Sequence, residues 1–525
     1  MKTRQKSDCR VVAQGIRKIT PTRSRKVKGG AKATTVTKET RQLNLGFGTA
    51  ENQGKTMPRA VGKAATHQRV AAMCAALLPN HKKETSPSAT MEEVVLRLTD
   101  AFAKIASNKG AAGPDRQSIE DVENQLVKIL PVLAKSLLGG IYIPGDIRRV
   151  WIPKAGGGER GLGIPNVVDR VVQEAVRQVL EPLYEPKFHT SSHGFRPNRG
   201  CHTAIAEAKT HVEEGNEWVV DIDLEKFFDR VNHQRLMARL AERVSDKRLL
   251  VLLGQMLKAK VVMPDGICVS TDEGVPQGGP LSPLLSNIVL DELDLELDKR
   301  GHRFVRYADD ANIYVKSERA GQRVMTSVKR FIEKRLRLKV NEHKSAVAKP
   351  EERHFLGFRL RCEPTAGKVE VLISKRTKER IDARIRELTP RNWGGSMNAA
   401  ITKINVYLVG WVGFFGICTA GAERTLGGLD AHIRRRLRAM QLKHWKSKLT
   451  QARRLIKLGV RPQTAWRTVY DGRKSTWALS HTPAVDRALP NATFAKRGLV
   501  SLLDRWKRKL ETIVVQGQLS LPLDM

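Results

Sequence analysis

The sequence predicts an α+β protein that continues into an all-α region. Between residues 111 and 373, amphipathic segments with apolar residues at i, i+3, i+4 and i+7 alternate with short β-like runs. From residue 374 to 448 the periodicity is helical throughout, and the segments are strongly basic. This change in composition near Leu372 places a domain boundary there.

The charge of the chain is its most unusual property. The 525 residues include 93 Lys and Arg against 54 Asp and Glu, which gives a formal net charge of +39. A protein this basic is expected to bind a polyanion, usually a nucleic acid. A solubilising surface or a membrane-surface binder would share the charge, but cations spread along the whole length favour a long nucleic-acid track.

The N-terminal residues 1–88 are basic and show little periodicity, so we expect a disordered arm with one short helix near residues 68–78. The first 60 residues lack an apolar core, which excludes a secretory signal, although an organellar transit peptide would share their composition. The sequence contains no run of 18 apolar residues, so we expect no membrane-spanning helix. Six dispersed cysteines without a Cys-x-x-Cys pair indicate free thiols in a reducing compartment.

The elements follow from periodicity and turn residues. A helical pattern begins near Met91 and stops at Asn108-Lys109-Gly110, and Gly113-Pro114-Asp115 is a turn before the next helix. Two basic β-arms at 148–154 and 159–165 flank a Gly-rich turn. The remaining expected elements are helices at 118–130, 167–181, 201–211, 232–257, 284–300, 321–338, 375–388, 397–415, 426–449 and 500–513, a loop at 274–283, and strands at 218–224, 339–347 and 354–360.

Two groups of carboxylates carry the strongest chemical signal. Tyr307-Ala308-Asp309-Asp310 lies at the bend of a predicted hairpin between apolar residues. Adjacent carboxylates repel and are costly to desolvate, so a divalent cation would compensate them, whereas an exposed acidic turn needs no partner. The buried strand at 218–224 carries Asp221 and Asp223 on one face. Together these acids could hold two metal ions for phosphoryl transfer, or the strand pair could cap the next helix.

Three motifs in this order resemble those of reverse transcriptases: Asp223-x-x-x-Phe227-Phe228, Val275-Pro276-Gln277-Gly278 and Tyr307-Ala308-Asp309-Asp310. The finer pattern over residues 90–525 resembles the proteins encoded by bacterial group II introns. It includes His193-Gly194-Phe195-Arg196-Pro197, and residues 405–415 resemble the maturase (X, or thumb) segment, which retron and retroviral enzymes would lack.

The resemblance implies a right-hand polymerase fold. It implies fingers with an N-terminal extension at 89–210, a palm with an antiparallel sheet at 211–373, an α-helical thumb/maturase domain at 374–449, and a basic DNA- or RNA-binding region at 450–525. The implied activity is RNA-directed DNA synthesis in the bacterial cytoplasm, at the nucleoid, with a second role in binding intron RNA for splicing. The implied partners are intron RNA, a DNA primer or target and dNTPs, with a possible homodimer and no membrane. A non-catalytic splicing factor and a polymerase recruited to repair or defence are the alternatives.

Carried over by position, Asp223, Asp309 and Asp310 resemble the metal-binding triad for two Mg²⁺ ions, with the backbone carbonyl of Leu224 as a further ligand. Asp221 matches no catalytic position. The resemblance gives roles to five more residues. They are Lys154 and Arg160 at the triphosphate (Arg148 and Arg149 are alternatives to Arg160), Phe228 excluding a 2′-OH, Gln277 at the incoming nucleotide, and Tyr307 at the primer end.

The helix around residues 429–449 has cations on every face, which favours an RNA or duplex track. The cations expected to contact nucleic acid are Arg434, Arg435, Arg436, Arg438, Lys443 and Lys446.

Two features depart from the family pattern. Arg116 stands where Gly is usual, and the paired cysteines and histidines of an endonuclease domain are missing. The chain thus resembles the endonuclease-lacking class C proteins, and we expect no DNA cleavage.

Overall fold

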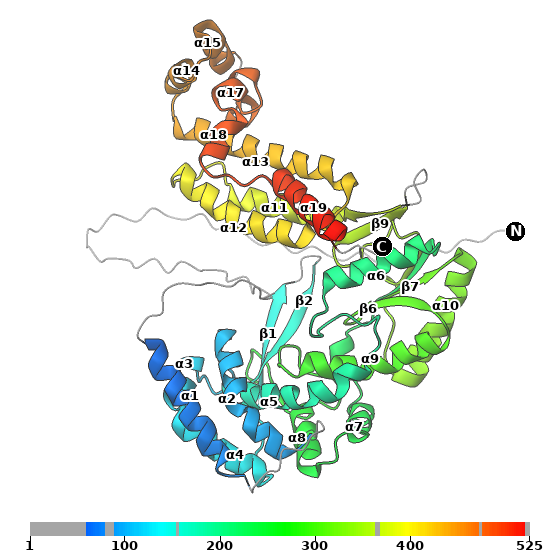
Figure 1. The fold of residues 1–525 in the computed structure, drawn as a ribbon. Helices are drawn as coiled ribbons and strands as arrows, with labels where there is room; N and C mark the ends of the chain where they lie inside the picture. Colours follow the sequence, from blue (N-terminus) through cyan, green and yellow to red (C-terminus); the bar gives the residue numbers. More distant parts are fainter. Residues whose placement is uncertain (1–58, 79–88, 154–156, 363–367, 472–474, 520–525) are drawn as a thin grey trace, which may run out of the picture. The chain divides into compact units, whose positions relative to one another are not determined.

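The computed structural model describes residues 59–78, 89–153, 157–362, 368–471 and 475–519 (Figure 1). Most of the predicted N-terminal arm, and Lys154, lie outside these ranges. The short helix expected near residues 68–78 is longer and begins earlier, as α1 (Arg59–Ala75). Its Val70 and Cys74 are buried in the same core as the next helices, which stabilises the helix.

A helical group forms the first part of the described chain. Helices α2 (Met91–Ser107), α4 (Leu126–Leu138) and α5 (Val167–Tyr184) pack together, with α2 along α5. The single helix predicted at 118–130 is wrong, because the chain forms α3 (Ile119–Asn124) and then α4. A capping box between Ser118 and Asp121 begins α3, and the break at Gln125 lets the apolar face of α4 turn into the core.

The basic arms form a β-hairpin, as predicted. Strand β1 (Ile147–Pro153) pairs antiparallel with β2 (Glu159–Ile164). Two strands of two residues each, β4 (Val261–Val262) and β5 (Cys268–Val269), extend this sheet in the order β2-β1-β4-β5. Strands this short have no periodicity from which they could be predicted.

A second sheet holds the acidic hairpin. Strands β3 (Trp218–Ile222), β6 (Arg303–Tyr307), β7 (Asp310–Val315) and β8 (Ala346–Ala348) are antiparallel in the order β6-β7-β3-β8. Helix α10 (Glu318–Phe331), continued by a wider turn at Ile332–Leu336, contacts β3, β7 and β8.

Further helices surround this sheet. Helix α6 (Cys201–Glu213) packs on β6, and α9 (Ser282–Lys299) contacts both α5 and β6. The single helix predicted at 232–257 is wrong, since it divides into α7 (His233–Ala241) and α8 (Lys247–Leu257). Asp246 causes the break, because its carboxylate caps α8 and also accepts a hydrogen bond from the Met91 amide.

The basic C-terminal part is helical, as expected. The hairpin of β9 (Phe358–Cys362) and β10 (Val369–Ile373) shares one hydrophobic core with α6 and the helices that follow. Helices α11 (Lys375–Leu388) and α12 (Met397–Phe415) have the predicted bounds, and α13 (Glu423–His444) is displaced by a few residues from its prediction. The remaining helices are α14 (Lys448–Lys457), α15 (Pro462–Tyr470), α16 (Thr476–Leu479), α17 (Pro483–Ala488), α18 (Asn491–Lys496) and α19 (Leu502–Leu519).

The α+β class predicted from the sequence is confirmed. Within the described ranges, no helix is both long enough and apolar enough to cross a membrane.

Candidate active site

The register of the second sheet brings the predicted acids to one end of it. In the pairing of β3 with β7, Asp221 lies opposite Asn312 and Ile222 opposite Ala311. Continued by one residue, the register sets Asp223 opposite Asp310. In the β6–β7 hairpin Tyr307 pairs with Asp310, which leaves Ala308 and Asp309 as a two-residue loop. The three predicted catalytic acids therefore share one sheet end, although Asp223 is far from the other two in sequence.

Burial and neighbouring carboxylates raise the pKa values of Asp309 and Asp310. Desolvation is the largest cause for Asp309, and the charge of Asp223 adds to it, while Arg160 and Lys344 act in the opposite direction. Residue Asp310 is exposed at the turn, yet protein atoms crowd its carboxylate. This desolvation, followed by repulsion from Asp309, Asp221 and Asp223, raises the pKa of Asp310 to about 7.

Two cations of the chain contact this cluster. The Lys344 ammonium lies 3.1 and 3.3 Å from the two carboxylate oxygens of Asp223. Arg353 donates to Asp221 from Nε at 2.9 Å and from Nη2 at 2.5 Å. Asp221 thus has a protein partner of its own, whereas Asp309 and Asp310 have no ion pair among the described residues. Neither cation was predicted, because each lies more than 120 residues from its acid.

The donor set fits a divalent metal. Carboxylate oxygens are the ligands that hard cations prefer, and mutual repulsion is the property that a bound cation would relieve. In the described part of the chain, no three His, Cys, Asp or Glu side chains form a ready metal cluster. Asp223 faces the Lys344 ammonium, so a metal ion on Asp223 would have to displace that ammonium.

The residues predicted to bind the nucleotide are linked by backbone contacts. The Gly163 amide on β2 donates to the Gln277 carbonyl at 2.7 Å, and the Val275 amide donates to the Phe228 carbonyl at 2.6 Å. Gly278 is required here, because its φ is +128° and a Cβ would lie 2.5 Å from the Gly163 carbonyl oxygen. The strand that carries Arg160 is thereby fixed to Gln277 and Phe228.

The other nucleotide-site residues differ in exposure. Arg160 is exposed on β2, and its charge acts on Asp309. Phe228 is half-buried, with its ring 5.2 Å from that of Phe227. The side chain of Leu224 is buried, and its backbone forms an isolated bridge with Val340.

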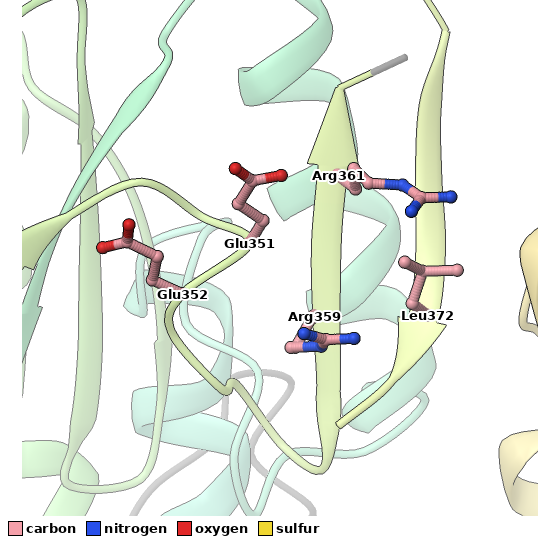
Figure 2. Close-up of a pocket in the computed structure, with 5 residues that line it drawn as sticks. All are labelled: Glu351, Glu352, Arg359, Arg361 and Leu372. Atoms are coloured by element: carbon pink, nitrogen blue, oxygen red, sulfur yellow. The ribbon is translucent and has the colours of Figure 1, made fainter. Parts of the chain in front are cut away.

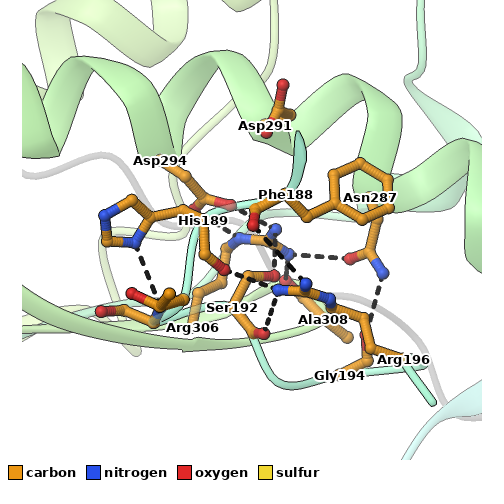
Figure 3. Close-up of polar contacts among 12 residues, drawn as sticks. Phe188, His189, Ser192, Gly194, Arg196, Asn287, Asp291, Asp294, Arg306 and Ala308 are labelled. Atoms are coloured by element: carbon orange, nitrogen blue, oxygen red, sulfur yellow. Dashed lines mark hydrogen bonds and ion pairs between the residues drawn. The ribbon is translucent and has the colours of Figure 1, made fainter. Parts of the chain in front are cut away.

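A buried polar network lies directly behind the turn that carries Asp309 (Figure 3). Arg306 and Asp294 are completely buried, with Nε–Oδ1 and Nη2–Oδ2 distances of 2.7 and 2.5 Å. The Arg306 guanidinium also donates to the Ala308 carbonyl at 2.9 Å, to Asn287 Oδ1 at 3.1 Å and to Ser192 Oγ at 2.7 Å. This network holds Ala308 in its left-handed conformation, at a φ of +57°.

The loop of His193 and Arg196 is tied to the same turn. The His193 amide donates to the Arg306 carbonyl at 2.9 Å, and Gly194 is so close that a Cβ on it would lie 2.3 Å from the Ala308 nitrogen. The His193 ring contacts Thr203 at 2.8 Å and Glu207 at 2.7 Å. Both histidine nitrogens are therefore engaged in structure.

Comparison with known proteins agrees with this geometry. Residues 152–360 match the family model "Reverse transcriptase (RNA-dependent DNA polymerase)", and residues 378–459 match "Group II intron, maturase-specific domain". Protein YkfC of Escherichia coli K12 is 32% identical over 372 residues, which are 61% of this chain and 94% of that protein. The chain belongs to the group II intron reverse transcriptase/maturase family. This confirms the predicted family and its RNA-directed DNA polymerase domain.

Other relatives of this reverse transcriptase are longer proteins. The group II intron-encoded protein LtrA of Lactococcus lactis subsp. cremoris is 30% identical over 332 residues, 50% of this chain and 54% of LtrA. The putative COX1/OXI3 intron 2 protein of Saccharomyces cerevisiae is 37% identical over 205 residues, 39% of this chain and 24% of that protein. The chain therefore spans only about half or a quarter of these two relatives.

The cations of α13 in this reverse transcriptase are not equivalent. Arg436 and Arg438 are buried. Arg436 donates to Thr389 Oγ1 at 2.6 Å, and Arg438 donates to the Leu489 carbonyl at 3.0 Å. Arg435 lies over the Trp477 ring at 4.0 Å. Protein groups thus engage three of the six predicted nucleic-acid contacts. Of the other three, Arg434 is half-buried, and Lys443 and Lys446 are exposed.

Tyr307, predicted at the primer end, is half-buried beside Cys201. Burial raises the pKa of its hydroxyl, and a hydrogen bond with the Cys201 thiol adds to the effect. Tyr307 is therefore neutral at physiological pH, which suits packing against a primer better than proton transfer.

A hollow of about 300 Å³ lies on the β9–β10 hairpin and not at the acids (Figure 2). Figure 2 shows Glu351 and Glu352 on the preceding loop, with Arg359, Arg361 and Leu372 on the two strands. None of these residues belongs to the predicted site of the reverse transcriptase, and their mixed charge favours no single ligand.

Proposed function

We propose that Asp223, Asp309 and Asp310 are the catalytic acids of this reverse transcriptase and that they bind two Mg²⁺ ions. The sheet register that sets Asp223 opposite Asp310 carries the proposal, together with the raised pKa values of the acids at the turn. Bound Mg²⁺ would supply charge stabilisation for the attacking and leaving oxygens of an in-line displacement. The Leu224 carbonyl would complete the ligand set.

The residues around the acids would then hold the substrates. Gln277 would contact the incoming dNTP, and the exposed Arg160 would bind its triphosphate, together with Lys154, which follows Pro153 in the sequence. The ring of Phe228 would lie under the deoxyribose and exclude a 2′-OH. Tyr307 would place the primer 3′ end, and the network behind Ala308 would keep Asp309 in position.

The second proposed role is the binding of intron RNA by the maturase-specific domain. The relatives LtrA and the yeast intron protein are named for introns, and the exposed cations Lys443 and Lys446, with the half-buried Arg434, provide contacts to phosphates. We place the protein with its intron transcript and DNA target in the bacterial cytoplasm at the nucleoid. The set of acids and Gln277 favours an active polymerase over a non-catalytic splicing factor.

Primer extension on an RNA template tests the catalytic assignment. Asp309→Ala should abolish extension with dNTPs and Mg²⁺ while RNA binding and splicing assistance remain. Asp229→Asn is the matched control, because Asp229 is an exposed acid near Asp223 in sequence. Full extension by Asp309→Ala, or equal loss in Asp229→Asn, would contradict the assignment.

A further inference from the structure

Phe195 is the exception in an otherwise buried stretch of chain. Residues 191–194 and Arg196 are buried, but Phe195 is 47% exposed. Its φ is +60°, in the left-handed region that bulky residues rarely adopt. Among the described residues its ring has no aromatic or cation–π partner. Packing in the core therefore explains neither the side chain nor its backbone conformation.

The strained conformation is imposed from both sides. On one side, the Gly194 carbonyl accepts a hydrogen bond from Asn287 Nδ2 at 2.9 Å (Figure 3). On the other side, Arg196 donates to the Ser192 carbonyl at 2.8 Å, to the His189 carbonyl at 2.6 Å and to Glu185 Oε1 at 2.9 Å. Strained residues persist where the surroundings fix them in this way, and they concentrate at functional sites.

The position of Phe195 identifies the relevant site. A Cβ on Gly194 would lie 2.3 Å from the Ala308 nitrogen, so these two backbones are in direct contact. Phe195 is one Cα step of about 3.8 Å from Gly194, and Asp309 is one step from Ala308. An exposed aromatic residue on a firmly held backbone therefore lies beside the turn that carries Asp309.

We propose that Phe195 contacts the template–primer, with its ring stacked on a base next to the catalytic turn. This inference rests on the proposed polymerase function. Stacking on an aromatic ring accepts every base, and phenylalanine has no group that could read base identity. A polymerase that copies any sequence needs a contact of this kind. The fixed backbone would present the ring without an ordering cost at each step.

The test replaces the ring and keeps the backbone conformation. Asn tolerates the left-handed region, so Phe195→Asn should fold with an unchanged or higher Tm. We expect its KM for template–primer, and the dissociation rate of an RNA–DNA hybrid, to rise roughly 5- to 150-fold, the range given by loss of one base stack. The KM for dNTP should stay within about twofold. Phe195→Tyr should behave as the wild type.

Val251→Ala is the matched control, because Val251 is a 56% exposed apolar residue on α8. Hybrid dissociation is also measured in an Asp309→Asn background, which separates binding from chemistry. Unchanged template–primer KM and hybrid dissociation in Phe195→Asn would overturn the contact. A change of oligomeric state without a change in hybrid affinity would overturn it too, in favour of a protein interface. Absence of RNA-templated extension by the wild type would instead overturn the proposed function.

Discussion

Arg306 and Asp294 form an ion pair that is entirely enclosed by protein, directly behind the turn that holds Asp309. A pair without solvent contact gains little net stability, but the loss of one partner leaves an uncompensated buried charge. Because the same guanidinium donates to the Ala308 carbonyl, the pair connects the interior of the sheet to the loop of the proposed catalytic acids.

Asp294→Asn should therefore lower the free energy of unfolding by about 3–5 kcal/mol. The reason is that Arg306 would keep its charge without a counter-ion. Urea unfolding at pH 7 measures the change. Glu292→Gln is the control on the same helix, because Glu292 pairs with the partly exposed Arg235 and should cost less than about 1 kcal/mol. Equal effects of the two substitutions would contradict the proposed cost of the buried charge.

Gly194→Ala should impair catalysis through the turn. The added methyl would overlap the Ala308 backbone, which can yield only by moving Asp309. We expect kcat to fall at least tenfold and Tm to decrease. Gly200→Ala in the same loop should resemble the wild type, since its Cβ would meet nothing within 4 Å and its φ is −171°. Steady-state primer extension compares the two, and wild-type kcat in Gly194→Ala would contradict the proposed close contact.

Glu207 should give the protein an acid-sensitive component of stability. Burial opposes its ionisation, but hydrogen bonds, with His193 at 2.7 Å the first of them, outweigh burial and lower its pKa to about 2. A depressed carboxyl pKa stabilises the fold above its unfolded value of 4.5, and this stability is lost as the pH falls through 4.5 towards 2. Glu207→Gln should thus cost about 3 kcal/mol at pH 7 and progressively less below pH 4. The unfolding free energies of the wild type and of Glu207→Gln should converge as the pH is lowered across this range. A constant difference between them would contradict the prediction.

Lys344→Met should strengthen binding of divalent cations in the absence of substrate. The ammonium of Lys344 contacts both oxygens of Asp223, so it competes with a metal ion for that carboxylate. The side chain is 66% exposed, and screening limits the expected gain to about three- to fivefold. Calorimetric titration with Mn²⁺ measures it. Lys349→Met, which removes a cation paired with Glu217, is the control and should leave the affinity unchanged.

Arg436→Ala and Lys443→Ala should separate structural cations from those that bind RNA. Arg436 is buried and donates to Thr389 and to the Arg386 carbonyl, so its loss should cost about 2–3 kcal/mol of stability. Lys443 is exposed, and its loss should leave Tm unchanged. The number of phosphate contacts inferred from the salt dependence of RNA binding should fall by about one. Thermal unfolding and filter binding at several salt concentrations distinguish the two. An unaltered Tm in Arg436→Ala would contradict its structural role.

The sequence predicted those features that depend on local pattern. The helices α11 and α12 match their expected bounds because each begins at a serine cap and keeps its apolar periodicity to the end. The acidic hairpin and the partner strand were also predicted, since alternation and the two-residue turn lie within a few residues. The split of 232–257 into two helices was missed because Asp246 is fixed by a distant partner, the Met91 amide.

The candidate site shows the same limit. Asp223, Asp309 and Asp310 were predicted from their motifs, and the register brings them together. Arg306 and Lys344 were missed because a single cation among the 93 Lys and Arg of the chain carries no signal until the fold supplies its partner. Conversely, Arg436 and Arg438 look like an RNA track in the sequence, but burial gives them protein partners.

The register of β3 against β7 also determines when the site can exist. Asp223 meets Asp310 only after β7 has been synthesised and has paired with a strand almost ninety residues earlier. A nascent chain that has emerged only as far as Asp310 therefore has all three proposed acids, but the rest of β7 is not yet available to bring them together. Lys344 lies further along the chain, so all three acids are synthesised before the chain's own counter-ion for Asp223.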